Sequence, residues 1–91
     1  MAGTVRNNTA HSRFELDVEG VTAYVSYHEE GGAVSLDHTL VPEQLGGRGI
    51  GSALAKGALE LLQTAGRKVI PRCSYIAGYI EKHPEYRNLV A

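Results

Sequence analysis

The chain has 91 residues, of which 43% are hydrophobic and 21% are charged, and its formal net charge at pH 7 is −1. This length suits one domain with a modest core, so we treat residues 1–91 as a single domain. The balanced charge and the absence of an apolar run near the roughly 20 residues of a membrane span argue against nucleic acid and membranes as partners.

The N-terminal residues and the cysteine content favour a cytoplasmic protein. Residues 1–8 lack the apolar stretch of a signal peptide. The single cysteine, Cys73, cannot form an internal disulfide, which fits a reducing compartment. Residues 1–11 are polar and aperiodic, so we expect a loose tail there.

Two strands are predicted after this tail. Residues 13–18 alternate strictly and place Phe14, Leu16 and Val18 on one face, as in a half-buried strand. Residues 21–28 are rich in Val, Thr and Tyr, which favour strands. The short turn between these segments predicts an antiparallel hairpin.

A third strand is expected over residues 33–41, after a turn at residues 29–32. Pro42 ends it. Strand periodicity predicts that its even positions share one face, namely Val34, Leu36, His38 and Leu40. This places His38 among apolar side chains.

A glycine-rich loop is the most informative segment of the chain. It holds Gly46, Gly47, Gly49 and Gly51, directly before a helix expected over residues 52–65. A glycine turn that leads into a helix leaves backbone amides unpaired, and the helix dipole adds positive charge there. The loop therefore predicts a site for a phosphate or diphosphate. Its spacing matches neither the P-loop nor the Rossmann fingerprint.

The remaining elements complete a mixed α+β fold. Helical spacing of apolar residues supports the first helix, with a core face of Ile50, Leu54, Gly57, Ala58, Leu61, Leu62 and Ala65. Residues 68–71 predict a fourth strand, parallel to the third because a helix connects them. Residues 74–82 predict a second helix, and Pro84 blocks its extension. We expect helices packed on one mixed sheet.

The glycine loop resembles the acetyl-CoA loop of the GNAT superfamily of N-acetyltransferases. That motif has Arg or Gln followed three residues later by Gly-x-Gly or Gly-x-Ala. Here the glycine pair falls on Gly49 and Gly51, while Gly46 replaces the Arg or Gln. The chain is also similar to the short Yjdj-type subgroup over residues 8–91. The matching segments are residues 38–42, the glycine loop, residues 70–75 and residues 83–86.

The resemblance implies a GNAT-like mixed sheet and transfer of an acetyl group from acetyl-CoA to a primary amine. It implies that the loop holds the diphosphate of CoA, through Gly46, Gly47, Arg48, Gly49, Ile50, Gly51 and Ser52. The pantetheine arm is expected along Thr39, Leu40 and Val41, with Cys73 and Ser74 near the thioester. We assign no metal ligands.

Two catalytic residues are expected, Cys73 and His38. A thiol at a helix N-terminus has a stabilised thiolate, so Cys73 is a candidate to accept the acetyl group or to protonate the departing CoA thiolate. A small buried hydrophobe is its alternative role. His38 is a candidate base, or a residue that orients Cys73; a satisfied core histidine is the alternative. The tyrosine acid common in the superfamily is missing, because its position falls on Glu81.

Two functions stay open on the sequence alone. The first is an N-acetyltransferase acting on a small-molecule or exposed peptide amine. The second is a module that binds acyl-CoA without catalysis, which the short chain allows because few residues remain for an acceptor pocket. A structural domain without a ligand leaves the glycine loop unexplained. The sequence does not decide between a monomer and a weak dimer.

Overall fold

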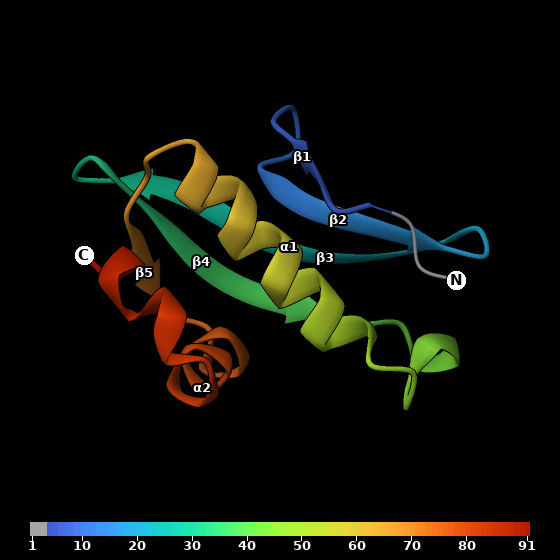
Figure 1. Cartoon of the computed structure of the whole chain (residues 1–91). Helices are drawn as coiled ribbons and strands as arrows, with labels where there is room; N and C mark the ends of the chain where they lie inside the picture. Colours follow the sequence, from blue (N-terminus) through green and yellow to red (C-terminus); the bar gives the residue numbers. More distant parts are fainter. Residues whose placement is uncertain (1–3) are drawn as a thin grey trace.

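A computed structural model describes residues 4–91 of the chain. Strands β1 (Arg6–Asn8), β2 (Arg13–Val18), β3 (Val21–Glu30), β4 (Ala33–Leu40) and β5 (Val69–Pro71) form one sheet in that order. Neighbours are antiparallel from β1 to β4, and β5 runs parallel to β4. Helix α1 (Ile50–Thr64) crosses one face of the sheet, and α2 (Ser74–Lys82) lies beside β5 (Figure 1). The predicted mixed α+β fold is confirmed.

Two-residue turns shape the antiparallel part of the sheet. Glu19 and Gly20 have φ of 53° and 79°, and Gly31 and Gly32 have φ of 58° and 84°. Two consecutive positive φ values are the geometry of a type I′ hairpin, whose twist matches that of the strands it joins. Because the second turn uses only its two glycines, β3 extends to Glu30, two residues beyond its predicted end.

The expected loose tail over residues 1–11 is wrong for Arg6–Asn8, which pair with β2 as strand β1. Residues 1–3 lie outside the described part. Polar contacts hold β1: Arg6 pairs with Glu15 and Asp17, and the Asn8 side chain donates to Glu15 at 3.1 Å. Strand prediction relied on apolar alternation, which these residues lack.

Glu15 is a buried carboxylate in the middle of β2, only 2% exposed. Arg6, Arg13 and Asn8 surround it. Burial alone raises the pKa of Glu15, but hydrogen bonds from Arg13 and Asn8 and the nearby positive charges outweigh burial. The pKa therefore lies below its ordinary value of 4.5.

Helix α1 begins and ends at glycines. Its N-cap is Gly49 with φ of 71°, and Ala53 donates to the Gly49 carbonyl at 3.1 Å. At the other end, Gly66 has φ of 70°, and the amides of Gly66 and Arg67 donate to the carbonyls of Gln63 and Leu62. This is a Schellman motif, which needs a left-handed residue after the helix.

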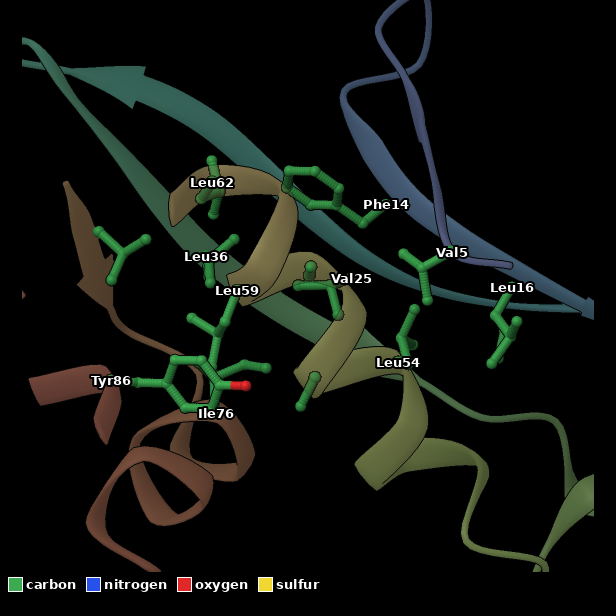
Figure 2. Packing of buried hydrophobic residues seen from close by; sticks show 14 of the residues in the cluster. Val5, Phe14, Leu16, Val25, Leu36, Leu54, Leu59, Leu62, Ile76 and Tyr86 are labelled. Atoms are coloured by element: carbon green, nitrogen blue, oxygen red, sulfur yellow. The ribbon is translucent and has the colours of Figure 1, made fainter. Parts of the chain in front are cut away.

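The core lies between the sheet and both helices. Side chains from β2, β3, β4, α1 and α2 converge there (Figure 2). The face of α1 was predicted only in part, because Leu59 is fully buried while Leu61 is 39% exposed and Ala65 is also exposed. Ile76 of α2 and Tyr86 of the 3-10 helix η2 (Pro84–Leu89) join the same core as Leu59. Helix α1 therefore packs against α2 as well as the sheet.

The parallel ladder between β4 and β5 is short. It pairs Val34 with Val69, Ser35 with Ile70 and Leu36 with Pro71, and then stops. Opposite β3, Ser26 pairs with His38 but Tyr27 pairs with Leu36, so Asp37 is an extra residue on β4. Such a bulge bends a strand and changes which residues share a face. No helix in the described part is long and apolar enough to cross a membrane.

Gly57 permits close contact between α1 and the chain before β1. A Cβ atom at Gly57 would lie 2.3 Å from Val5 Cγ2 and 2.6 Å from Val5 Cβ. We expect Gly57→Ala to destabilise the fold, measured by urea unfolding, although alanine favours helices by about 1 kcal/mol. Gly78→Ala in α2 is the control, because its Cβ meets nothing within 4 Å and should stabilise. Equal gains from both variants would contradict this contact.

The lowered pKa of Glu15 predicts a loss of stability in acid. Its ionised form contributes stability that is complete above the ordinary pKa of 4.5 and is lost as pH falls through the folded-state value. We expect Glu15→Gln to lower the free energy of unfolding at neutral pH by about 2 kcal/mol. The difference from the wild type should stay constant from about pH 7 to about pH 5.5, and it should shrink as pH falls further through 4.5 and below. A pH-independent difference in thermal unfolding would exclude this role.

Candidate functional site

The loop before α1 presents unpaired backbone amides. The short 3-10 helix η1 (Glu43–Leu45) leads into it, and the buried Leu45 anchors it to the core. Gly47 and Gly49 have φ of 74° and 71°, which glycine adopts readily. Within residues 4–91, no backbone carbonyl accepts a hydrogen bond from the amides of residues 47–52. These amides are therefore free to bind an anion.

Two members of the predicted loop site have other contacts. The amide of Gly46 donates to the Glu43 carbonyl at 3.0 Å, so it is not part of the free set. The Arg48 guanidinium pairs with both oxygens of Glu19, at 3.1 and 3.0 Å, on the turn between β2 and β3. Arg48 therefore contributes its backbone amide, while its side chain fastens the loop to the sheet.

A pocket of about 250 Å³ opens beside the start of α1. Ser52 lines its α1 side, and α2 supplies most of the rest, namely Ser74, Tyr75, Gly78, Tyr79 and Lys82, with His83 at the end of the helix. The hydroxyls of Ser52 and Tyr75 lie 3.2 Å apart. A Cβ at Gly51 would lie 2.7 Å from the Tyr75 hydroxyl, so the absent side chain leaves room for this ring. The predicted residues Ser52 and Ser74 thus meet in one pocket.

The side chains of Tyr75, Tyr79, Lys82 and His83 were not among the predicted site residues. Tyr75, Tyr79 and Lys82 recur every three or four positions and so share one face of α2, and His83 follows at the C-cap of the helix. The buried residues of α2, Ile76 and Ile80, occupy its other face. This amphipathic pattern was visible in the sequence, but what the polar face borders depends on the placement of α1.

Cys73 lies at the N-cap of α2 and close to β4. Its amide donates to the Leu36 carbonyl at 2.9 Å, and its Sγ lies 3.3 Å from the Thr39 hydroxyl oxygen. Burial raises the pKa of the thiol, but hydrogen bonds from Thr39 and from the amides of Tyr75 and Ile76 outweigh burial. The pKa of Cys73 is therefore lowered from its ordinary value of 9.0. The structure brings Cys73 together with Thr39, both predicted site residues.

His38 does not share a face with Val34 and Leu36, which corrects the sequence prediction. The bulge at Asp37 reverses the alternation, so Thr39 pairs with the buried Val25 while His38 pairs with Ser26 on the opposite face. His38 is exposed. His38 is therefore not a core residue. Among the described residues, the side chain that contacts the Cys73 thiol is Thr39, and no hydrogen bond joins His38 to Cys73.

Residues 39–41 lie at an open edge of the sheet. Beyond Leu36, β4 has no β5 partner in the described chain. Thr39 is half-buried, Leu40 is 49% exposed on the same face as His38, and Val41 packs against the core. This edge connects the Cys73–Thr39 pair with the glycine loop.

Comparison with known proteins identifies the family of this chain. A sequence profile described as GCN5-related N-acetyl-transferase matches residues 13–89. The chain belongs to the GCN5-related N-acetyltransferase family. This confirms the resemblance noted in the glycine loop and places the protein in a family of acetyltransferases.

Relatives and a solved structure agree with membership of the GCN5-related N-acetyltransferases. The chain is 37% identical to Protein NATD1 of Gallus gallus over 81 residues, which is 89% of this chain and 66% of that protein. Protein NATD1 of Homo sapiens is also 37% identical, over 89% of this chain and 65% of that protein. The NMR solution structure of a GCN5-like protein from Staphylococcus aureus matches with a TM-score of 0.68 and 26% identity. That match covers all of this chain and 87% of the other.

This GCN5-related N-acetyltransferase carries a closed polar ring on the sheet face opposite α1. Arg72 pairs with Glu30 and donates through Nε to the Ser35 hydroxyl at 3.1 Å. Ser35 donates to Asp37 at 2.6 Å, and His28 contacts Asp37 at 2.7 Å and Glu30 at 3.0 Å. The contacts with Asp37 and Glu30 raise the pKa of His28 above 6.5. The ring joins the bulge to the residue before Cys73.

The contact between Thr39 and Cys73 predicts an effect on thiol reactivity. Thr39→Val should raise the pKa of Cys73 and slow its alkylation by iodoacetamide near neutral pH by a factor of about two to ten, the value of one hydrogen bond. Thr22→Val is the control, because Thr22 contacts Asp17 and not Cys73. The pH dependence of alkylation measures the change, and an unaltered profile in the Thr39 variant would contradict this contact.

Proposed function

We propose that this chain transfers an acetyl group from acetyl-CoA to a primary amine. The observation that carries this proposal is the set of unpaired amides over residues 47–52, which adjoins the pocket between α1 and α2. The amides and the helix dipole supply positive partial charge, and a Cβ atom at Gly47 or Gly49 would meet nothing within 4 Å, so the surroundings of these two residues are open. These features suit the diphosphate of CoA.

The open edge of β4 is the proposed track for the pantetheine arm. Exposed strand edges offer backbone donors and acceptors in a row, and the arm carries two amide groups that match them. Thr39, Leu40 and Val41 lie along this edge, between the glycine loop and Cys73. An arm that follows them would bring its thioester to the Cys73–Thr39 pair.

The reaction requires one bond to form and one to break. The amine nitrogen attacks the thioester carbonyl carbon, the carbon–sulfur bond breaks, and sulfur departs as a thiolate. The nitrogen must lose a proton and the sulfur gains one. We assign stabilisation of the developing oxyanion to a backbone amide near Leu40 or Val41.

Cys73 has two candidate roles in this reaction. As a nucleophile, its thiolate would accept the acetyl group as a new thioester before the amine takes it. As an acid, its thiol would protonate the CoA thiolate. The lowered pKa of Cys73 serves either role. Its free thiol also supports the cytoplasmic location that we propose.

His38 is the proposed base for the acceptor amine. It lies on the sheet face opposite Cys73, together with the exposed Leu40. A base there would take the proton from an amine that approaches the thioester from this face. Exposure of both residues suits a small amine or the amine of an exposed peptide.

Binding is tested by thermal unfolding with and without acetyl-CoA. The wild type should gain thermal stability with acetyl-CoA, since a ligand of the native state stabilises it. Gly51→Ala should displace Tyr75 and crowd the amides, weakening acetyl-CoA by about tenfold or more. Gln63→Ala, on the exposed far end of α1, should bind like the wild type. No ligand-induced rise in the wild type would refute the proposal.

Catalysis is tested by free-thiol release with a panel of amines and by mass spectrometry. A nucleophilic Cys73 predicts an adduct of about 42 Da after incubation with acetyl-CoA, absent in Cys73→Ser. Turnover without an adduct, lowered in Cys73→Ser, would assign the acid role. Binding without release of CoA for any amine would support the alternative, a module that binds acyl-CoA without catalysis.

A further inference from the structure

A second pocket, of about 230 Å³, lies at the end of α1 that is far from the glycine loop. Its helix side is formed by Leu61 and Leu62 in the last turn of α1 and by Ala65 at the C-cap. With a helical rise of about 1.5 Å per residue, Leu62 lies about 15 Å along α1 from Ser52. The two pockets share no lining residue, so a ligand here leaves the proposed acetyl-CoA site free.

The floor of the second pocket is apolar. Phe14, Val34 and Leu62 line it, and none of the three is more than 5% exposed. Tyr27 packs on Phe14, with ring centroids 5.0 Å apart and an interplanar angle of 38°. Phe14 and Leu62 lie at this end of α1 (Figure 2). A cavity of about 150 Å³ with a similar lining holds benzene, so the second pocket has room for one ring or one branched aliphatic group.

An ion pair forms one side of the rim. Arg67 Nη1 donates to Glu29 Oε2 at 3.1 Å, and Nη2 donates to Oε1. The two side chains stay 34% and 60% exposed. A guanidinium has five N–H groups, and within residues 4–91 Glu29 is the only group that accepts from Arg67. The remaining N–H groups can bind a carboxylate, while the outer side of the Glu29 carboxylate can bind an ammonium.

The other side of the rim supplies a further donor. The Tyr27 hydroxyl donates to Asn7 Oδ1 at 2.7 Å, which assigns the second polar atom of this amide as Nδ2, a donor with two N–H groups. No acceptor in residues 4–91 contacts Nδ2. The rim therefore offers donors from Asn7 and Arg67 and one carboxylate from Glu29. A ligand with a carboxylate and an ammonium side by side complements this arrangement, because each charge then meets its opposite.

We propose that the second pocket binds a free α-amino acid with an aromatic or large aliphatic side chain. The side chain occupies the apolar floor, the carboxylate contacts Arg67 and Asn7, and the ammonium contacts Glu29. A peptide C-terminus presents a ring and a carboxylate without the adjacent ammonium, and an aromatic amine lacks the carboxylate. The site is thus selective for the free amino acid, and it is independent of the proposed acetyl transfer.

The test is isothermal titration calorimetry with four probes. L-phenylalanine carries the ring and both charges, N-acetyl-L-phenylalanine lacks the ammonium, phenethylamine lacks the carboxylate, and L-alanine lacks the ring. The wild type should bind L-phenylalanine about tenfold more tightly than either single-charge analogue, the usual contribution of one charge-assisted contact. Loss of the buried ring should weaken L-alanine by about tenfold or more.

Two variants locate the site. Arg67→Gln should weaken L-phenylalanine by about tenfold and remove its advantage over phenethylamine. Ala65→Leu adds a side chain at the mouth of the second pocket and should weaken L-phenylalanine by a similar factor, about tenfold. Arg87→Gln is the matched control, because Arg87 is an exposed arginine of η2 outside the pocket, and it should bind like the wild type. Thermal unfolding of each ligand-free variant checks that the fold is intact.

The outcomes are distinguishable from a failure of the proposed function, which acetyl-CoA itself tests. No binding of L-phenylalanine by the wild type, or equal binding of N-acetyl-L-phenylalanine or phenethylamine, would overturn the amino-acid site. Wild-type affinity in both Arg67→Gln and Ala65→Leu would place the amino acid elsewhere and also overturn it. Acetyl-CoA should bind equally well with and without saturating L-phenylalanine, whereas competition between them would contradict two separate pockets.

Discussion

The short parallel ladder between β4 and β5 determines where the functional residues lie. Both strands run in the same direction, so their carboxyl ends point to the same edge of the sheet. The glycine loop and α1 follow β4 at this edge, and Cys73 and α2 follow β5 there. Two helix N-termini are thereby directed toward one region, which is where ligands bind in sheets of this kind. The last pair of the ladder joins Leu36 to Pro71, and the amide of Cys73 donates to the Leu36 carbonyl, so Cys73 lies where the ladder stops.

The two faces of the sheet have different physical characters. The face toward α1 is apolar and supplies the core. The opposite face carries ion pairs and hydrogen bonds, around Glu15 and in the polar ring that includes Arg72. Exposed ion pairs contribute little stability singly, but a buried carboxylate fixes the position of its partners. On this second face the polar contacts therefore fix the positions of side chains, including Asp37 at the bulge, which contacts Ser35 and His28.

Local signals in the sequence predicted most of the architecture. The paired turn residues defined both hairpins, and the glycines at 49 and 66 bounded α1 to within two residues. Strand β1 was not predicted because its pairing depends on polar contacts of Arg6 and Asn8 with Glu15 of the next strand, and not on apolar alternation within β1 itself. The burial of Leu59 was not predicted because the sequence analysis assumed that α1 packs against the sheet alone, whereas α2 also packs against α1.

The candidate site was predictable as far as it depends on backbone conformation. The free amides follow from glycines before a helix, and Cys73 follows from its place at the start of the next helix. The face of His38 was not predictable, because one unpaired residue on β4 reverses the alternation and nothing local in the sequence marks Asp37 as that residue. The aromatic lining of the pocket depends on how α2 lies against α1, which is a tertiary arrangement.

The bulge at Asp37 behaves like a spacer inserted into an otherwise regular strand. If this residue were removed, the neighbours on both sides would keep their present faces, because Thr39 would again follow Leu36 by two positions. The bend would disappear, however, and a straight β4 would be free to continue its ladder along the segment after β5. One extra residue thus separates a β4 that could pair along its whole length from the observed β4, whose parallel ladder ends at Leu36.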